Sequence, residues 1–179
     1  MATNMTTTVP GGLGTHFLPA DPQIQSPIGR AFGILLSHFT EMTTAETRIE
    51  TGGLDVLGLE LLQELRAAER SREPLIEAAF DVIAAPELGP EDRGLRRMAF
   101  LLTELLALED DAERQRLHAQ SCRHRDLFGI PVAGPAARMA RRMQTAFFRQ
   151  FDALAELQEY GGAGIAPEVQ AEFPDPVPA

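Results

Sequence analysis

The clearest helical pattern in the chain is PAARMARRMQTAFFRQFDALAELQEY, which spans residues 135–160. Its apolar residues recur every three or four positions, which is the spacing of one face of an α-helix. That face consists of Ala140, Met143, Phe147, Phe151 and Leu154. The opposite face consists of Arg138, Arg142, Thr145, Arg149, Asp152 and Glu156. Gly134-Pro135 before the stretch and Gly161-Gly162 after it are typical of a helix start and a helix end, so we expect one amphipathic helix here.

The same spacing predicts three helices in the first half of the chain. The first begins at Ser26-Pro27, because Ser is a good N-cap and Pro suits the first helical position. A second is expected over about 55–70 and a third over about 74–84, since Pro74 should break or kink a helix. The side chains expected to face inward from the second helix are Leu57, Leu61, Leu62 and Leu65.

A further helix is expected to start at Glu91-Asp92, where acids complement the helix dipole, and to run to Leu108. The acidic residues 109–111 either break this helix or are crossed by a weaker pattern that continues to about Arg123. The chain has no alternating run of Val, Ile and Thr and no Asn-Gly or Asp-Gly hairpin signal. We therefore predict an all-α fold, a bundle of four to six helices.

The composition predicts one domain with a tail at each end. Residues 26–160 carry the helical patterns and form the predicted single helical-bundle domain. Residues 1–25 are rich in Thr, Gly and Pro, and residues 161–179 are Pro-rich and acidic, so both are expected to be flexible tails.

Several classes of protein are disfavoured by composition. No apolar run approaches the roughly 18 residues of a membrane span. The single Cys122 fits a reducing compartment, and the first residues resemble neither a secretory signal nor a transit peptide, so we expect a cytoplasmic protein. All 16 cationic residues are Arg, which is typical of a GC-rich bacterial genome. The absence of Trp and the presence of one Tyr argue against a base-stacking platform.

The net charge of −10 is unevenly distributed along the chain. Residues 50–111 carry six Arg and fifteen acids, whereas residues 112–149 carry eight Arg and only two acids. Residues 150–179 carry six acids and no Arg. A block of one sign inside a chain of the other sign is the most informative feature of this sequence.

Two interpretations of the Arg block remain open. In one, the Arg residues pair internally with the acidic helices of 50–111. In the other, they face outward and bind an acidic protein surface or phosphates. The outward interpretation gives the candidate partner-binding residues Arg138, Arg141, Arg142, Arg149, Arg123 and Arg125. The Arg residues in the first half of the last helix lie towards its amino-terminal end, where the helix dipole disfavours positive charge. This costs little free energy when the side chains are exposed.

A second candidate set is His118, Cys122 and His124, because His and Cys are ligands of Zn²⁺. The set lacks an obvious fourth ligand and is flanked by Arg, so a polar helix end is favoured and no metal centre is expected. A nucleophilic Cys122 paired with either His would lack a third orienting group. We therefore predict no catalytic residue.

These observations favour a non-enzymatic helical interaction protein that docks an acidic protein partner through the Arg-bearing face of its last helix. Such a protein could be an adaptor, a regulator or an assembly component. One alternative is a nucleic-acid-associated transcriptional regulator that uses the same Arg residues, and another is a metal or small-molecule sensor. No phosphate loop, G-x-G-x-x-G segment after a strand or H-E-x-x-H motif occurs, so no cofactor is expected. The apolar stripes also allow a homo-oligomer.

Overall fold

Helices account for nearly all of the chain that the computed structural model describes, which is residues 25–51, 59–130, 133–160 and 162. The elements are α1 (Pro27–Thr51), α2 (Leu59–Ala84), α3 (Asp92–Ala107), α4 (Asp111–Arg123), α5 (Pro135–Glu156) and the 3₁₀ helices η1 (Arg125–Phe128) and η2 (Gln158–Tyr160). No strand occurs within these ranges, so the predicted all-α bundle is confirmed. The predicted tails lie almost entirely outside the described residues.

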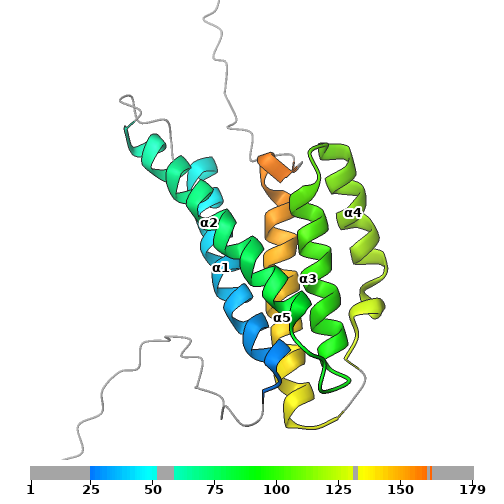
Figure 1. Cartoon of the computed structure of the whole chain (residues 1–179). Helices are drawn as coiled ribbons and strands as arrows, with labels where there is room; N and C mark the ends of the chain where they lie inside the picture. Colours follow the sequence, from blue (N-terminus) through cyan, green and yellow to red (C-terminus); the bar gives the residue numbers. More distant parts are fainter. Residues whose placement is uncertain (1–24, 52–58, 131–132, 161, 163–179) are drawn as a thin grey trace, which may run out of the picture.

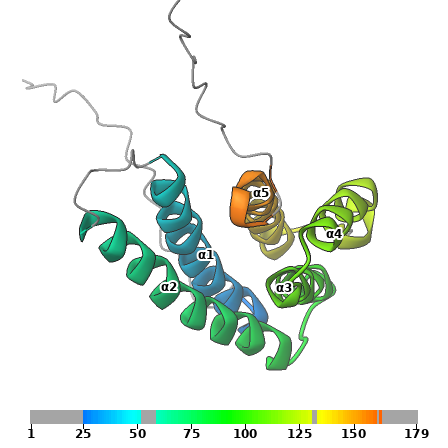
Figure 2. The same ribbon diagram turned by 90° about the horizontal axis from the view of Figure 1, so that it is seen from above.

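The helices form a hairpin that packs against a three-helix group (Figures 1 and 2). Helices α1 and α2 run side by side in opposite directions, and α1 separates α2 from α5 (Figure 2). Helix α3 contacts α1, α2 and α5, and α4 packs on the outer side of α3 and α5. The described part of the chain contains no helix long and apolar enough to cross a membrane.

The start of α1 is fixed by a buried polar contact to α3. The Ser26 hydroxyl accepts a hydrogen bond from the Gly29 amide at 3.0 Å, as expected for an N-cap, and donates to the Asp92 carboxylate. Asp92 is fully buried, and its other oxygen accepts from the amides of Leu88 and Gly89 at 2.9 and 3.0 Å. One carboxylate therefore joins the start of α1 to the loop before α3, and the predicted cap at Ser26 is confirmed.

A break or a kink was predicted at Pro74, and the break is wrong, because Pro74 lies inside the continuous helix α2. A proline removes one backbone hydrogen bond, and packing on both sides of it can compensate for that loss. Ala68 before Pro74 and Leu75 after it are both buried. The start of this helix at about residue 55 falls outside the described residues.

The inward orientation predicted for two leucines of α2 is also wrong. Leu62 is 50% exposed and Leu65 is 41% exposed. The buried face of α2 consists of Ala68, Leu75, Ala78, Ala79 and Val82. Small residues let two helices approach closely, so the alanine-rich face rather than the leucine face packs on α1. The predicted contacts of Leu57 and Leu61 lie outside the described side chains.

The acidic residues after α3 end that helix rather than being crossed by it. Helix α3 ends at Ala107, and Asp110 caps α4 by accepting a hydrogen bond from the Glu113 amide at 2.9 Å. An aspartate at an N-cap satisfies a helix-end amide that otherwise has no partner. The chain therefore turns here, and α4 returns along α3 and α5.

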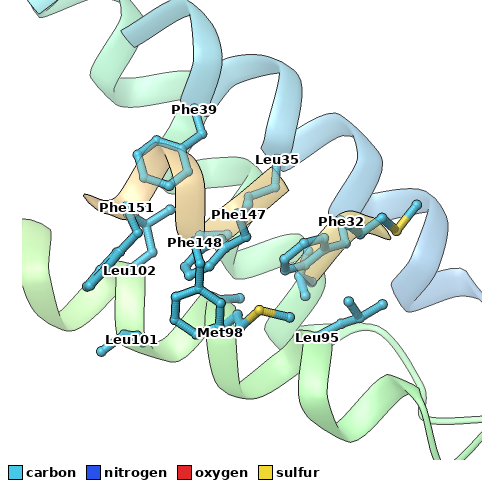
Figure 3. Packing of buried hydrophobic residues seen from close by; sticks show 14 of the residues in the cluster. Phe32, Leu35, Phe39, Leu95, Met98, Leu101, Leu102, Phe147, Phe148 and Phe151 are labelled. Atoms are coloured by element: carbon cyan, nitrogen blue, oxygen red, sulfur yellow. The ribbon is translucent and has the colours of Figure 1, made fainter. Parts of the chain in front are cut away.

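The core is built around the apolar face of α5 (Figure 3). Phe147 is fully buried, and its ring centroid lies 5.9 Å from that of Phe32 and 5.7 Å from that of Phe39. Phe151 stacks on it at 5.6 Å. All five residues predicted for this face are buried, so the predicted amphipathicity is confirmed. Helix α5 ends at Glu156, four residues earlier than predicted, and η2 follows it.

Candidate functional site

Arg138, Arg142 and Arg149 lie on the outer face of α5, opposite the phenylalanine core. All three side chains are exposed. None of them forms an ion pair or a hydrogen bond with any other residue that the structure describes. The acidic helices of residues 50–111 therefore do not neutralise these three cations within the described part of the chain.

The other predicted Arg residues differ in their surroundings. Arg123, at the end of α4, is exposed and makes no polar contact with another described residue. Arg141 donates from Nε and Nη2 to the Ile130 carbonyl at 3.3 and 3.1 Å, so it ties α5 to the segment that precedes it. Arg125 is bound to Asp152. We refer to Arg138, Arg142 and Arg149 as the α5 arginine face.

Arg125 connects η1 to α5 by two contacts. Its Nη2 donates to Oδ1 and Oδ2 of Asp152, each at 2.7 Å, and its guanidinium lies 4.7 Å from the ring centroid of Phe148. Burial tends to raise the pKa of Asp152, but the hydrogen bonds from Arg125 and His118 hold that pKa below its usual value. Asp152 therefore stays ionised at neutral pH.

A shallow depression lies on the surface of α5 between Arg125 and Arg149. Its lining consists of Arg125, Gln144, Thr145, Phe148, Arg149 and Asp152. Gln144 donates one N–H to the Phe128 carbonyl at 2.9 Å and Thr145 donates its hydroxyl to the Arg141 carbonyl at 3.0 Å, so each uses a donor inside the protein. The exposed guanidinium of Arg149, which has no ion pair or hydrogen bond among the described residues, offers its donors to an external group.

His118, Cys122 and Asp152 converge beside this depression. The Sγ atom of Cys122 lies 3.6 Å from Nε2 of His118, which lies 3.1 Å from Oδ1 of Asp152. Cys122 Sγ and Asp152 Oδ1 are 3.9 Å apart. The two α4 residues are four positions apart on one helix face, and Asp152 comes from the neighbouring α5.

The structure replaces one member of the predicted His118, Cys122 and His124 set. His124 caps the end of α4 through its amide, which donates to the Gln120 carbonyl at 3.0 Å, and it is not part of the converging group. Asp152 supplies the third donor instead. The sequence does not predict the role of Asp152, because that role depends on the packing of α4 on α5. The one signal in the sequence is that Asp152 is an acid on a helix face that otherwise carries Arg.

A second polar cluster, also missed from sequence, joins the middle of α2 to the carboxyl-terminal part of α1 and to η2. Arg72 of α2 donates to Glu46 of α1 at 2.8 Å and also contacts Glu159 of η2. The Glu46 side chain is only 4% exposed, and burial raises its pKa. The guanidinium groups of Arg72 and Arg114 lie 5.8 and 5.4 Å from the Tyr160 ring. These contacts hold η2 on the bundle.

Comparison with known proteins adds no assignment, since no protein-family model, curated protein or solved structure matches the chain significantly.

Proposed function

We propose that this protein is a non-enzymatic helical interaction protein that docks an acidic protein partner through the α5 arginine face. The observation that carries the proposal is the exposure of Arg138, Arg142 and Arg149 without an ion-pair partner among the described residues. Guanidinium groups bind carboxylates through strong charge-assisted hydrogen bonds. We place this adaptor, regulator or assembly component in a bacterial cytoplasm, where it could also act as a homo-oligomer.

The geometry favours a protein partner over a small molecule. The depression beside Arg149 is open and shallow, whereas small-molecule sites enclose most of the ligand surface. Along α5, Arg138, Arg142 and Arg149 follow one another at intervals of four and seven residues, which is the periodicity of a helix face. An acidic helix or extended peptide laid along α5 would meet all three side chains.

The test measures binding of a fluorescently labelled poly-glutamate peptide by anisotropy at low salt. The triple variant Arg138→Gln, Arg142→Gln, Arg149→Gln should lose at least about tenfold in affinity, since each exposed pair contributes up to about 1 kcal/mol. The matched control is Arg48→Gln, Arg66→Gln, Arg93→Gln, which removes three other exposed arginines and changes the net charge equally. This control should bind like the parent protein.

Two outcomes would reject the proposal. Equal weakening by both triple variants would mean that the peptide responds to net charge rather than to the α5 arginine face. The second outcome is that a labelled DNA duplex binds more tightly than the peptide, with an affinity that falls steeply with salt. That result would favour the nucleic-acid-associated regulator that uses the same residues.

A further inference from the structure

The thiol of Cys122 and the carboxylate of Asp152 both face the same ring nitrogen of His118. Nε2 of His118 is 3.6 Å from Cys122 Sγ and 3.1 Å from Asp152 Oδ1. In a nucleophilic relay, one ring nitrogen accepts the proton of the nucleophile while the other donates to the carboxylate. A single nitrogen cannot do both. The geometry is therefore that of three donors around one point and not that of a proton relay.

We propose that His118 Nε2, Cys122 Sγ and Asp152 Oδ1 bind a divalent transition-metal ion, with Zn²⁺ as the preferred metal. Zinc bonds are about 2.3 Å to sulfur and about 2.0 Å to nitrogen and oxygen. Tetrahedral angles then separate the ligand atoms by roughly 3.3–3.6 Å. The separations in this site are 3.6, 3.1 and 3.9 Å, so only small side-chain adjustments would bring all three donors onto one ion.

The chemistry of the donors selects the class of metal. One thiolate, one imidazole and one carboxylate suit zinc, whereas Mg²⁺ and Ca²⁺ prefer sites made of oxygen atoms. Three protein donors leave the fourth position of a tetrahedral ion for water or an incoming ligand. This composition is typical of reactive zinc sites rather than of closed structural ones.

Arg125 supplies the outer contact that a metal-binding carboxylate needs. Its Nη2 lies 2.7 Å from both Oδ1 and Oδ2 of Asp152 and 3.6 Å from Sγ of Cys122, so it has to release Oδ1 and the thiol when an ion binds. The guanidinium is itself held over the ring of Phe148 at 4.7 Å. When Oδ1 binds the ion, Arg125 can keep Oδ2, which fixes the orientation of the carboxylate. His118 is likewise packed against Phe151, with ring centroids 5.6 Å apart.

The test uses the full-length protein, stripped with a chelator and titrated with Co²⁺ as a coloured substitute for Zn²⁺. We expect one Co²⁺ per chain, with a near-ultraviolet thiolate-to-cobalt charge-transfer band and visible bands as intense as those of four-coordinate cobalt. Subsequent addition of Zn²⁺ should displace the cobalt and remove both signals. A folded protein that gives no charge-transfer band would overturn the proposal.

Three variants separate this site from adventitious binding. Cys122→Ser should abolish the charge-transfer band, and Asp152→Asn should weaken Co²⁺ binding by at least about tenfold while leaving helix content unchanged by circular dichroism. His124→Asn is the matched control, because His124 is adjacent in sequence and is not one of the three donors. The proposal fails if the band persists in Cys122→Ser, or if His124→Asn loses cobalt as completely as Cys122→Ser does.

Discussion

Arg72 and the α5 arginine face show two different uses of the same side chain. Arg72 lies between Glu46 and Glu159, and its guanidinium also covers Tyr160. The three arginines of the α5 face have no such partner among the described residues. An acidic chain therefore does not neutralise its cations indiscriminately. It pairs one where α1, α2 and η2 meet and leaves a row of others exposed on the surface of α5.

The largest effect is expected from removing the paired cation. Arg72→Met should lower the free energy of unfolding at pH 7 by about 2–3 kcal/mol, because the nearly buried Glu46 loses its cation. Urea denaturation followed by circular dichroism measures this. Glu159→Gln should cost less than about 1 kcal/mol, since the Glu159 side chain is half-exposed. If Arg72→Met lowers the free energy of unfolding no more than Glu159→Gln does, the role assigned to Glu46 is contradicted.

The stability difference between the parent and Arg72→Met should shrink as the pH falls from 7 towards 4.5. Burial already raises the pKa of Glu46, and removing Arg72 should raise it further. A carboxyl group whose folded pKa exceeds its unfolded value, about 4.3 for Glu, binds an extra proton in the folded state, so acidification favours the folded variant. In the parent, burial tends to raise the pKa of Glu159, but the hydrogen bond from Arg72 lowers it overall.

The lowered pKa of Glu159 means that the parent loses this contribution to stability as the pH falls through the folded value. Glu46 therefore narrows the difference between the two proteins as the pH falls towards 4.5, and Glu159 narrows it further below that pH. Urea midpoints measured at several pH values test this, and a difference that stays constant or widens on acidification would show that Glu46 and Glu159 do not set it.

Removing arginines from the α5 face should leave stability nearly unchanged. Arg142→Gln with Arg149→Gln should alter the free energy of unfolding by no more than about 0.5 kcal/mol, because both side chains are exposed and have no ion-pair partner among the described residues. The same double variant should bind the poly-glutamate peptide more weakly. A stability loss above about 1 kcal/mol would place these residues in the internal charge network instead.

The smallest expected effect is a gain in stability. Arg138 lies near the amino-terminal end of α5, where the partial positive charge of the helix repels a cation, so Arg138→Gln should stabilise the fold by about 0.3 kcal/mol. Thermal unfolding followed by circular dichroism can detect this difference in stability when the parent and the variant are scanned together. Arg149→Gln, about three turns farther along the helix, is the control and should show no gain.

Much of the fold could be predicted from the sequence because local signals decide it. The apolar spacing of α5 and the Ser26 cap each depend on residues within a few turns of one another. The prediction for α2 was wrong where packing outweighs such signals. Pro74 suggested a break, and Leu62 suggested a buried face, but α2 continues through Pro74 with Ala68 and Leu75 buried on either side of it, and it packs through a face that excludes Leu62.

The candidate sites depend on contacts between residues far apart in the chain. His118 and Asp152 are separated by 34 positions, and Arg72 and Glu159 by 87. Periodicity placed Arg138, Arg142 and Arg149 on the polar face of their helix. It could not show whether acidic side chains of another helix would reach them, because that depends on the arrangement of α2 and α3 around α5.

Tyr160 gives this protein its own optical probe. It is the only tyrosine in a chain without tryptophan, and its ring is 4% exposed beneath Arg72 and Arg114. Burial raises its pKa to about 12, whereas a solvated tyrosine ionises near pH 10. The alkaline ultraviolet titration of the phenol, together with its fluorescence, therefore reports whether η2 is docked. Any event that lifts this turn from α1 and α2 can be followed without attaching a label.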